Sequence, residues 1–166
     1  MVAGHPSAPG YLFKKYADDV PSQEQISNYE ARIKGAEKLA ALIRREDLQH
    51  VVVPRKYLHE LPRSFGKSSR VLIVERLDIV GRDESERRYR DVDEPVLRDL
   101  LRVLVEFPGL DSNSKNVQFT HEGKIAFVDL ENWKRPDRKT VQLKSIGQYL
   151  SKEKLKLARR ILEELE

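Results

Sequence analysis

The chain of 166 residues contains no cysteine. This absence excludes disulfide bonds, catalysis by a thiolate and zinc sites that use cysteine. The four histidines are scattered and form no His-Glu-x-x-His pattern, so no familiar zinc site is expected either. No apolar run approaches the roughly 18 residues that a membrane span needs, and the first thirty residues lack the basic-then-apolar pattern of a signal peptide. We therefore expect a soluble, cytoplasmic protein without a membrane span.

The charge of the chain is close to balanced. Lysine and arginine together number 31, aspartate and glutamate 27, and the formal net charge is +4. This excess is far from the one-signed surface of a dedicated nucleic-acid-binding protein, so no nucleic-acid partner is expected. Hydrophobic residues make up 39% and charged residues 35% of the chain, which fits one domain with a modest core and many solvated faces.

The first part of the chain contains one strand signal and one helix signal. The opening ten residues hold two prolines and two glycines, which interrupt regular structure, and residues 11–16 then predict a short strand. Apolar residues at steps of three and four predict an amphipathic helix over 22–45, with Ser22 and Gln25 as a capping box. Gly35 interrupts this helix at a cost of ~1 kcal/mol relative to alanine. A second backbone passing close by would explain the glycine.

The rest of the chain alternates between strand and helix signals, which indicates an α+β fold. Residues 81–92 are nearly all polar and predict a mobile loop. Asp93 is expected to cap a largely buried helix that ends at Pro108-Gly109. The remaining predicted elements are strands at 51–53 and 70–74, a hairpin with strands at 117–119 and 124–128, and a helix from about residue 151.

Three polar residues around the hairpin carry the strongest functional signal. Asp111 and Asn116 stand five apart in a loop after the buried helix, and Asp129 follows Asn116 by thirteen residues. This segment resembles the catalytic segment of the protein-kinase fold, where Asp-x-x-x-x-Asn is followed across a two-stranded hairpin by the Asp of Asp-Phe-Gly. The resemblance implies that Asp111 lies beside the attacking hydroxyl. It also implies that Asn116 and Asp129 hold Mg²⁺, or Mn²⁺, on the phosphates of ATP, with Glu131 as a further candidate metal ligand.

The residues upstream follow the order of the same family. The segment that ends at Lys14 resembles the Val-Ala-x-Lys strand, which implies that Lys14 contacts the α- and β-phosphates. The helix over 22–45 takes the place of the helix whose glutamate orients that lysine. We expect Glu37 in this role because it precedes the strand at 51–53 by about the interval found in the family, and Glu30 on the same face is the reserve.

Residues 71–77 look like the strand and hinge that bind the adenine edge through main-chain groups, with Glu75 and Leu77 at the hinge. The resemblance covers residues 11–133 and implies a two-lobed α+β fold with a small antiparallel sheet and a mostly helical C-lobe. It implies a single kinase-like domain over residues 1–166, with an N-lobe to about residue 75, a hinge over about 75–80 and a truncated C-lobe over about 81–166.

The chain also departs from the family pattern. It has no Gly-x-Gly-x-x-Gly, and only ten residues precede the lysine strand, so nucleotide is expected to bind more openly. Gly109-Leu110 replaces His-Arg, Asn113 replaces a lysine, Leu130-Glu131 replaces Phe-Gly, and no Ala-Pro-Glu follows. The chain therefore resembles the pared-down kinases found among bacterial effector proteins, for which delivery into a host cytosol is expected, or a fragment of a kinase.

These features together predict an ATP- and Mg²⁺-dependent phosphotransferase that acts on a hydroxyl of a protein substrate. Two alternatives stay open. A small-molecule kinase of the aminoglycoside or choline type shares the same Asp and Asn spacing and tolerates a glycine such as Gly109. A pseudokinase scaffold that binds a protein partner would explain the missing glycine loop. Taken one at a time, Asp111 and Asn116 are also typical of turn and capping residues.

Overall fold

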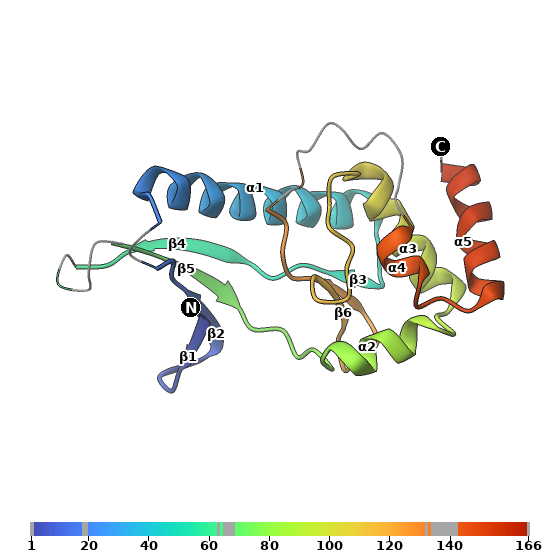
Figure 1. Cartoon of the computed structure of the whole chain (residues 1–166), viewed down its shortest axis with the longest axis horizontal. Helices are drawn as coiled ribbons and strands as arrows, with labels where there is room; N and C mark the ends of the chain where they lie inside the picture. Colours follow the sequence, from blue (N-terminus) through green and yellow to red (C-terminus); the bar gives the residue numbers. More distant parts are fainter. Residues whose placement is uncertain are drawn as a thin grey trace.

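The computed structural model describes residues 2–17, 20–62, 64, 69–131, 133 and 143–165, and of Lys144 the backbone alone. Within these ranges the chain is a mixed α+β structure with five helices and two small sheets (Figure 1). Helix α1 (Ser22–Glu46) runs along the long axis of the molecule and contacts strands of both sheets. None of the helices in the described ranges is long and apolar enough to cross a membrane.

A four-stranded antiparallel sheet forms one end of the molecule. Its strands lie in the order β1-β2-β5-β4. Helix α1 follows β2 in the chain and packs against the sheet through Tyr29, which is 1% exposed and clusters with Leu72 and Val74 of β5. Lys14 ends β2 and pairs with Leu72. The strands are β1 (Val2–His5), β2 (Ala8–Lys14), β4 (Lys56–Glu60) and β5 (Arg70–Glu75).

A three-stranded sheet connects this end of the molecule to the helices. Strand β3 (Val51–Val52) pairs in parallel with β7 (Ile125–Phe127), and β7 forms an antiparallel hairpin with β6 (Val117–Phe119). The turn of the hairpin contains Gly123 with a φ of +84°, a conformation that glycine adopts without steric cost. The predicted hairpin is therefore confirmed.

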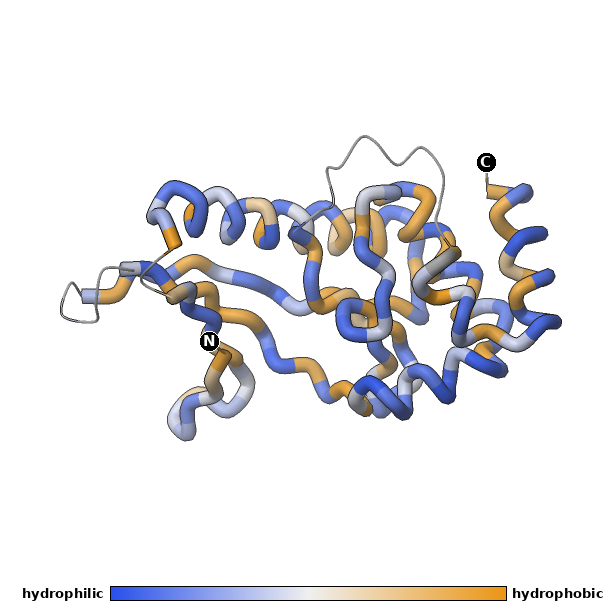
Figure 2. The backbone as a smooth tube through the Cα atoms, in the orientation of Figure 1, coloured by the Kyte–Doolittle hydropathy of each residue, from blue (hydrophilic) through white to orange (hydrophobic). Residues whose placement is uncertain are grey.

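The larger hydrophobic core lies among the remaining helices and the three-stranded sheet. Helix α3 is central to it, since Leu97, Leu100 and Leu101 are fully buried. Figure 2 shows hydrophobic and hydrophilic residues alternating along α1 and α5, as expected of helices with one buried face. The helices of this part are α2 (Arg82–Tyr89), α3 (Glu94–Glu106), α4 (Lys144–Gly147) and α5 (Lys152–Leu165).

Two predictions about local structure are wrong. The opening residues form β1 and the start of β2, because the turn at residues 6–7 lets the two strands pair as a hairpin. Residues 82–89 form a helix and not a loop. Ion pairs at i,i+4 spacing cross the surface of this helix, and its two buried residues bond to β6: the Tyr89 hydroxyl donates to the Val117 carbonyl, and the Ser85 hydroxyl accepts from the Phe119 amide.

The predicted capping box at the start of α1 is also wrong. Pro21 occupies the N-cap position, and no side chain caps the helix. Gln25 instead turns back and donates to the Val20 carbonyl at 2.7 Å. Proline suits the start of a helix because its missing amide proton would have had no helical partner there.

The explanation offered for Gly35 is confirmed, and the neighbouring backbone is now identified. A Cβ atom on Gly35 would lie 2.8 Å from the Leu130 carbonyl oxygen and 2.8 Å from the Trp133 ring. The Trp133 indole also donates to the Ala31 carbonyl at 3.0 Å, one turn earlier on the same helix. Gly35 therefore lets the segment after β7 pass directly against α1, which brings Asp129 and Glu131 close to that helix.

Candidate functional site

A pocket of about 270 Å³ lies between the two sheets. Val2, Leu12, Lys14 and Val74 come from the four-stranded sheet, and Gln118 comes from β6 of the other. A second pocket of about 190 Å³ shares Val2 and Lys14 with the first and adds Arg32 of α1. The other residues that line the first pocket are Pro54, Glu75, Leu77, Ile79, Lys115 and Val128.

The segment after β5 lines this pocket with Leu77 and Ile79. The Leu77 amide has no hydrogen-bond acceptor in the described part of the chain, whereas the Arg76 amide before it donates to the Gly10 carbonyl at 2.8 Å. The Glu75 carboxylate is held by Arg55 at 3.1 Å, and this hydrogen bond lowers the pKa of Glu75. Glu75 and Leu77, the two residues expected at a hinge, both line the pocket.

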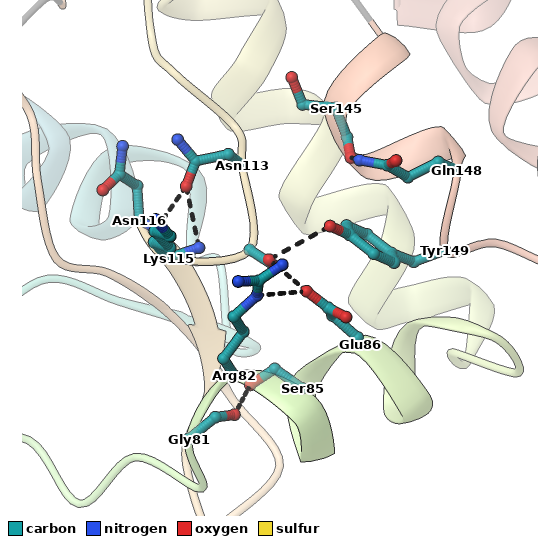
Figure 3. Close-up of polar contacts among 11 residues, drawn as sticks. Gly81, Arg82, Ser85, Glu86, Asn113, Lys115, Asn116, Ser145, Gln148 and Tyr149 are labelled. Carbon is teal, nitrogen blue, oxygen red and sulfur yellow. Dashed lines mark hydrogen bonds and ion pairs between the residues drawn. The ribbon is translucent and has the colours of Figure 1, made fainter.

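The loop before β6 is ordered by its own side chains. The Asp111 carboxylate accepts hydrogen bonds from the Asn113 amide and from Asn113 Nδ2, at 3.3 and 2.6 Å. Asn113 Oδ1 in turn accepts from the amides of Lys115 and Asn116 (Figure 3). The Asn116 side chain makes no hydrogen bond to any described residue, so its amide group is available to a ligand.

A polar network fixes the same loop to two helices. Ser114 donates to the Glu86 carboxylate of α2 at 2.6 Å, and Arg82 donates to the same carboxylate at 2.8 Å (Figure 3). Tyr149, just beyond α4, lies 3.3 Å from the Ser114 hydroxyl. These hydrogen bonds lower the pKa of Glu86, with the bond from Ser114 contributing most. The network therefore anchors the loop on the side away from the pocket.

The hairpin places Asn116 beside Val128, the residue before Asp129. The Val128 amide donates to the Asn116 carbonyl at 2.9 Å, so the residues that flank β6 and β7 lie side by side. Asp129 Oδ1 accepts from the Glu131 amide at 3.2 Å. The hairpin therefore brings the backbone of Asn116 to within one residue of Asp129, and the joint role expected of the two residues stays a prediction.

Arg32 of α1 bridges two carboxylates beyond β7. Its Nε lies 3.3 Å from the Asp129 carboxylate, and its terminal nitrogen donates to the Glu131 carboxylate at 2.6 Å. The Arg32 side chain is 16% exposed. Among the described residues, its Nε is the one solvent-inaccessible side-chain nitrogen or oxygen that makes no hydrogen bond. Sequence analysis missed this residue.

Two lysines complete a cluster of three cations around Asp129. Lys56, at the start of β4, is 6% exposed and donates to the Val128 carbonyl at 3.0 Å. Burial lowers the pKa of Lys56 to about 8, although the negative charge of Asp129 opposes the shift. Burial also lowers the pKa of Lys14, again against the influence of Asp129. Lys14 is therefore where the sequence predicted it, and Lys56 is a second cation that the sequence analysis missed.

The pair expected between Lys14 and Glu37 is not formed. No ion pair joins these side chains in the described structure, and Glu37 is exposed, in a separate pocket between α1 and β4. Glu30, the reserve, pairs with Lys34 at 3.9 Å, and no ion pair joins it to Lys14 among the described residues. Of the charged residues of α1, Arg32 is the one that reaches the Asp129 cluster.

Two residues near the hairpin carry oxygen donors of the type that a hard divalent cation prefers. Asp129 supplies a carboxylate and Asn116 an amide oxygen, the donors that Mg²⁺ prefers when phosphates and waters complete its shell. The described residues hold no group of three or more His, Cys, Asp or Glu side chains that could bind a metal alone. The donor set therefore suits a cation that is shared with a phosphorylated ligand.

Neither a protein-family model nor a curated protein sequence matches this chain. The pocket, the loop and the cation cluster are therefore the features of this chain that bear on its function.

Proposed function

We propose that this chain is an ATP- and Mg²⁺-dependent phosphotransferase with a pared-down, two-lobed kinase-like fold, and that it transfers the γ-phosphoryl group to a protein hydroxyl. One observation carries the proposal. A single pocket is lined by Leu77, whose amide has no acceptor in the described part of the chain, by Lys14 and by Val128, which directly precedes Asp129. A nucleotide needs a main-chain donor at its base, and cations and metal ligands at its phosphates.

The order of the elements supports this proposal. The strand that ends in Lys14 is followed by a long helix, then by the strands that lead to the hinge, and then by the buried helix α3. The loop from Asp111 to Asn116 and the β6-β7 hairpin follow α3, in the order that the kinase family uses. Strand β1 precedes the lysine strand and covers part of the pocket through Val2, although no glycine loop is present.

The charges around Asp129 suit a triphosphate. Lys14, Arg32 and Lys56 bring three cations to the site, whereas Asp129 and Glu131 bring two carboxylates. The excess positive charge, in a partly desolvated site, favours a polyanion, because electrostatic attraction is stronger where water is excluded. Lys14 and Arg32 line the smaller pocket next to the base pocket, which is where phosphates would extend.

The remaining polar residues would take part in transfer of the γ-phosphoryl group. Asn116 and Asp129 would hold Mg²⁺, which neutralises charge on the phosphates when it is bound. The Asp111 carboxylate would accept the proton of the acceptor hydroxyl, and its hydrogen bonds to Asn113 orient it for this task. The network from Ser114 to Glu86 would keep this loop in position during the reaction.

A second candidate function, a pseudokinase scaffold, is favoured by one contact. Arg32 pairs with both Asp129 and Glu131, so a cationic side chain already lies where a metal would bind. In that case the pocket would bind nucleotide without a metal, and the chain would act by binding a protein partner.

Intact-mass measurement after incubation with Mg-ATP tests the proposal. A generic basic protein and an aminoglycoside serve as acceptors in separate reactions. We expect a mass gain of one phosphoryl group on the protein acceptor or on the chain itself, lost in Asp111→Asn and kept in Asp91→Asn, which changes an exposed aspartate at the end of α2. Transfer to the aminoglycoside alone contradicts the proposed acceptor, and nucleotide binding without any transfer favours the pseudokinase.

A further inference from the structure

Gln118 is a polar residue in the floor of an otherwise largely apolar pocket. It lies at the centre of β6, where side chains alternate between the two faces of the sheet. Val117 and Phe119 on either side belong to the large hydrophobic core, and Gln118 lines the pocket on the opposite face. Leu12 and Val74 of the four-stranded sheet line the same pocket.

The side-chain amide of Gln118 has no hydrogen-bond partner among the residues that the structure describes. The residue is only 9% exposed, yet its side chain makes no hydrogen bond in the described part of the chain. Among the described residues, only Arg32 Nε is both inaccessible to solvent and without a hydrogen bond. The Gln118 amide atoms, which also make no hydrogen bond, are therefore accessible to solvent. The Gln118 amide therefore reaches open space, and the space beside it is the pocket. A ligand that displaces water from the pocket must therefore supply hydrogen-bond partners to this amide, because leaving it unpaired would be costly.

We infer that Gln118 selects the base of the nucleotide, by donating a hydrogen bond to N7 of adenine and accepting one from its exocyclic amine. This inference rests on the proposed function, because it assumes that the pocket takes a purine nucleotide. The amide of glutamine is complementary to this edge of adenine, which offers one acceptor and one donor. The same edge of guanine offers two acceptors, so the amide oxygen of Gln118 would face another oxygen.

The selectivity for adenine over guanine should therefore come from the Gln118 side chain, which adds to the hydrogen bond of the Leu77 amide. The Leu77 amide donates to any ring nitrogen placed against the hinge, and so it does not by itself require the exocyclic amine. Gln118 lies on the opposite sheet and adds the pair of contacts that distinguishes the two purines. A leucine in its place would keep the shape of the floor and remove both contacts.

Dissociation constants for Mg-ATP, Mg-GTP and Mg-7-deaza-ATP test this inference. We expect the wild-type protein to bind ATP about tenfold or more tightly than either GTP or 7-deaza-ATP, which has a carbon at the N7 position. Gln118→Leu should bind all three within about threefold of one another. Gln23→Leu makes the same change at an exposed position of α1 and should keep the wild-type preference.

The outcomes separate this inference from the proposed function. A wild-type protein that binds ATP and 7-deaza-ATP equally overturns the role of Gln118 while the nucleotide site stands, and this comparison needs no variant. Unchanged selectivity in a folded Gln118→Leu protein has the same meaning. A wild-type protein that binds none of the three nucleotides overturns the proposed function and the role of Gln118 together.

Discussion

Arg32 lies 3.3 Å from the Asp129 carboxylate, on the same helix from which the sequence predicted Glu37 to reach Lys14. The helix therefore brings a positive charge to the site. Together with Lys14 and Lys56 it surrounds Asp129 with cations from a strand, a helix and a second strand. In a chain without a glycine-rich loop, side-chain cations can supply the contacts to phosphate that main-chain amides supply elsewhere.

The first prediction concerns Arg32 itself. Arg32→Met keeps the length and apolar stem of the side chain but removes its charge, so it should weaken Mg-ATP binding about tenfold, as expected for loss of a charge-assisted hydrogen bond. Isothermal titration measures this change. Arg44→Met, at an exposed position of the same helix, is the matched control and should bind as the wild type does. Tighter binding by Arg32→Met would show that Arg32 competes with the metal, and would support the pseudokinase.

The second prediction concerns the pH dependence of stability at Lys56. The pKa of Lys56 falls from 10.5 to about 8 on folding. Between these values the unfolded chain binds a proton that the folded chain releases, so the free energy of unfolding rises as the pH rises from about 8 to 10.5. The rise should be on the order of 3 kcal/mol.

Urea unfolding at a series of pH values measures the effect as a difference from Lys56→Met, which lacks this group. Lys38→Met, an exposed change on α1, should keep the wild-type slope. Parallel curves for wild type and Lys56→Met would mean that Lys56 titrates normally in the folded protein.

The third prediction concerns the contact between α1 and the segment after β7. Alanine is ~1 kcal/mol better than glycine inside an exposed helix. At Gly35, however, the new methyl group would meet the Leu130 carbonyl oxygen at 2.8 Å. Gly35→Ala should therefore lower the free energy of unfolding by about 1 to 3 kcal/mol, the cost of overpacking.

Gly147→Ala is the control for this prediction, because a Cβ there has no neighbour nearer than 3.4 Å. Its effect should stay within about 1 kcal/mol of zero. If Gly35→Ala proved as stable as the wild type, the close passage of Leu130 against α1 would be in doubt, and with it the approach of Asp129 to Arg32.

Much of the fold could be predicted from local signals. The long first helix, the buried helix α3 and the β6-β7 hairpin follow from hydrophobic periodicity and from Gly123, and each is present. Helix α2 was missed because its sequence is almost entirely charged. What makes it a helix is the burial of Ser85 and Tyr89 against β6, a tertiary contact that no local pattern announces.

Sequence analysis named some residues of the candidate site and missed others, because part of the site depends on tertiary contacts. The spacing of Asn116 and Asp129 can be read from the sequence. In the structure the hairpin pairs Asn116 with Val128, the residue before Asp129. Arg32 was missed because the buried face of α1 was predicted from its apolar residues alone. The buried residues include Tyr29, Ala36 and Leu39, and Arg32 continues their steps of three and four. Once the buried face of a helix is identified, a charged residue on that face indicates a candidate site residue.

Lys56 had a weaker signal. It follows Val51-Val52-Val53-Pro54-Arg55, and the strand that it begins was not predicted. Its burial depends on how α1 and the Val128 segment pack over the start of β4. Such burial arises from the meeting of three elements that are distant in sequence, and alternation along one short strand does not reveal it.

The metal dependence of ATP binding tests the central claim most directly. Calorimetric titration of ATP is performed with Mg²⁺ and with EDTA, on the wild-type protein and on Asp129→Asn, which keeps the shape of the side chain. If Asp129 holds Mg²⁺ on the phosphates, wild-type affinity should fall at least about tenfold without Mg²⁺, and Asp129→Asn should bind ATP with an affinity that Mg²⁺ does not change. Wild-type binding that is equally tight in EDTA, or no binding at millimolar Mg-ATP, would contradict the account.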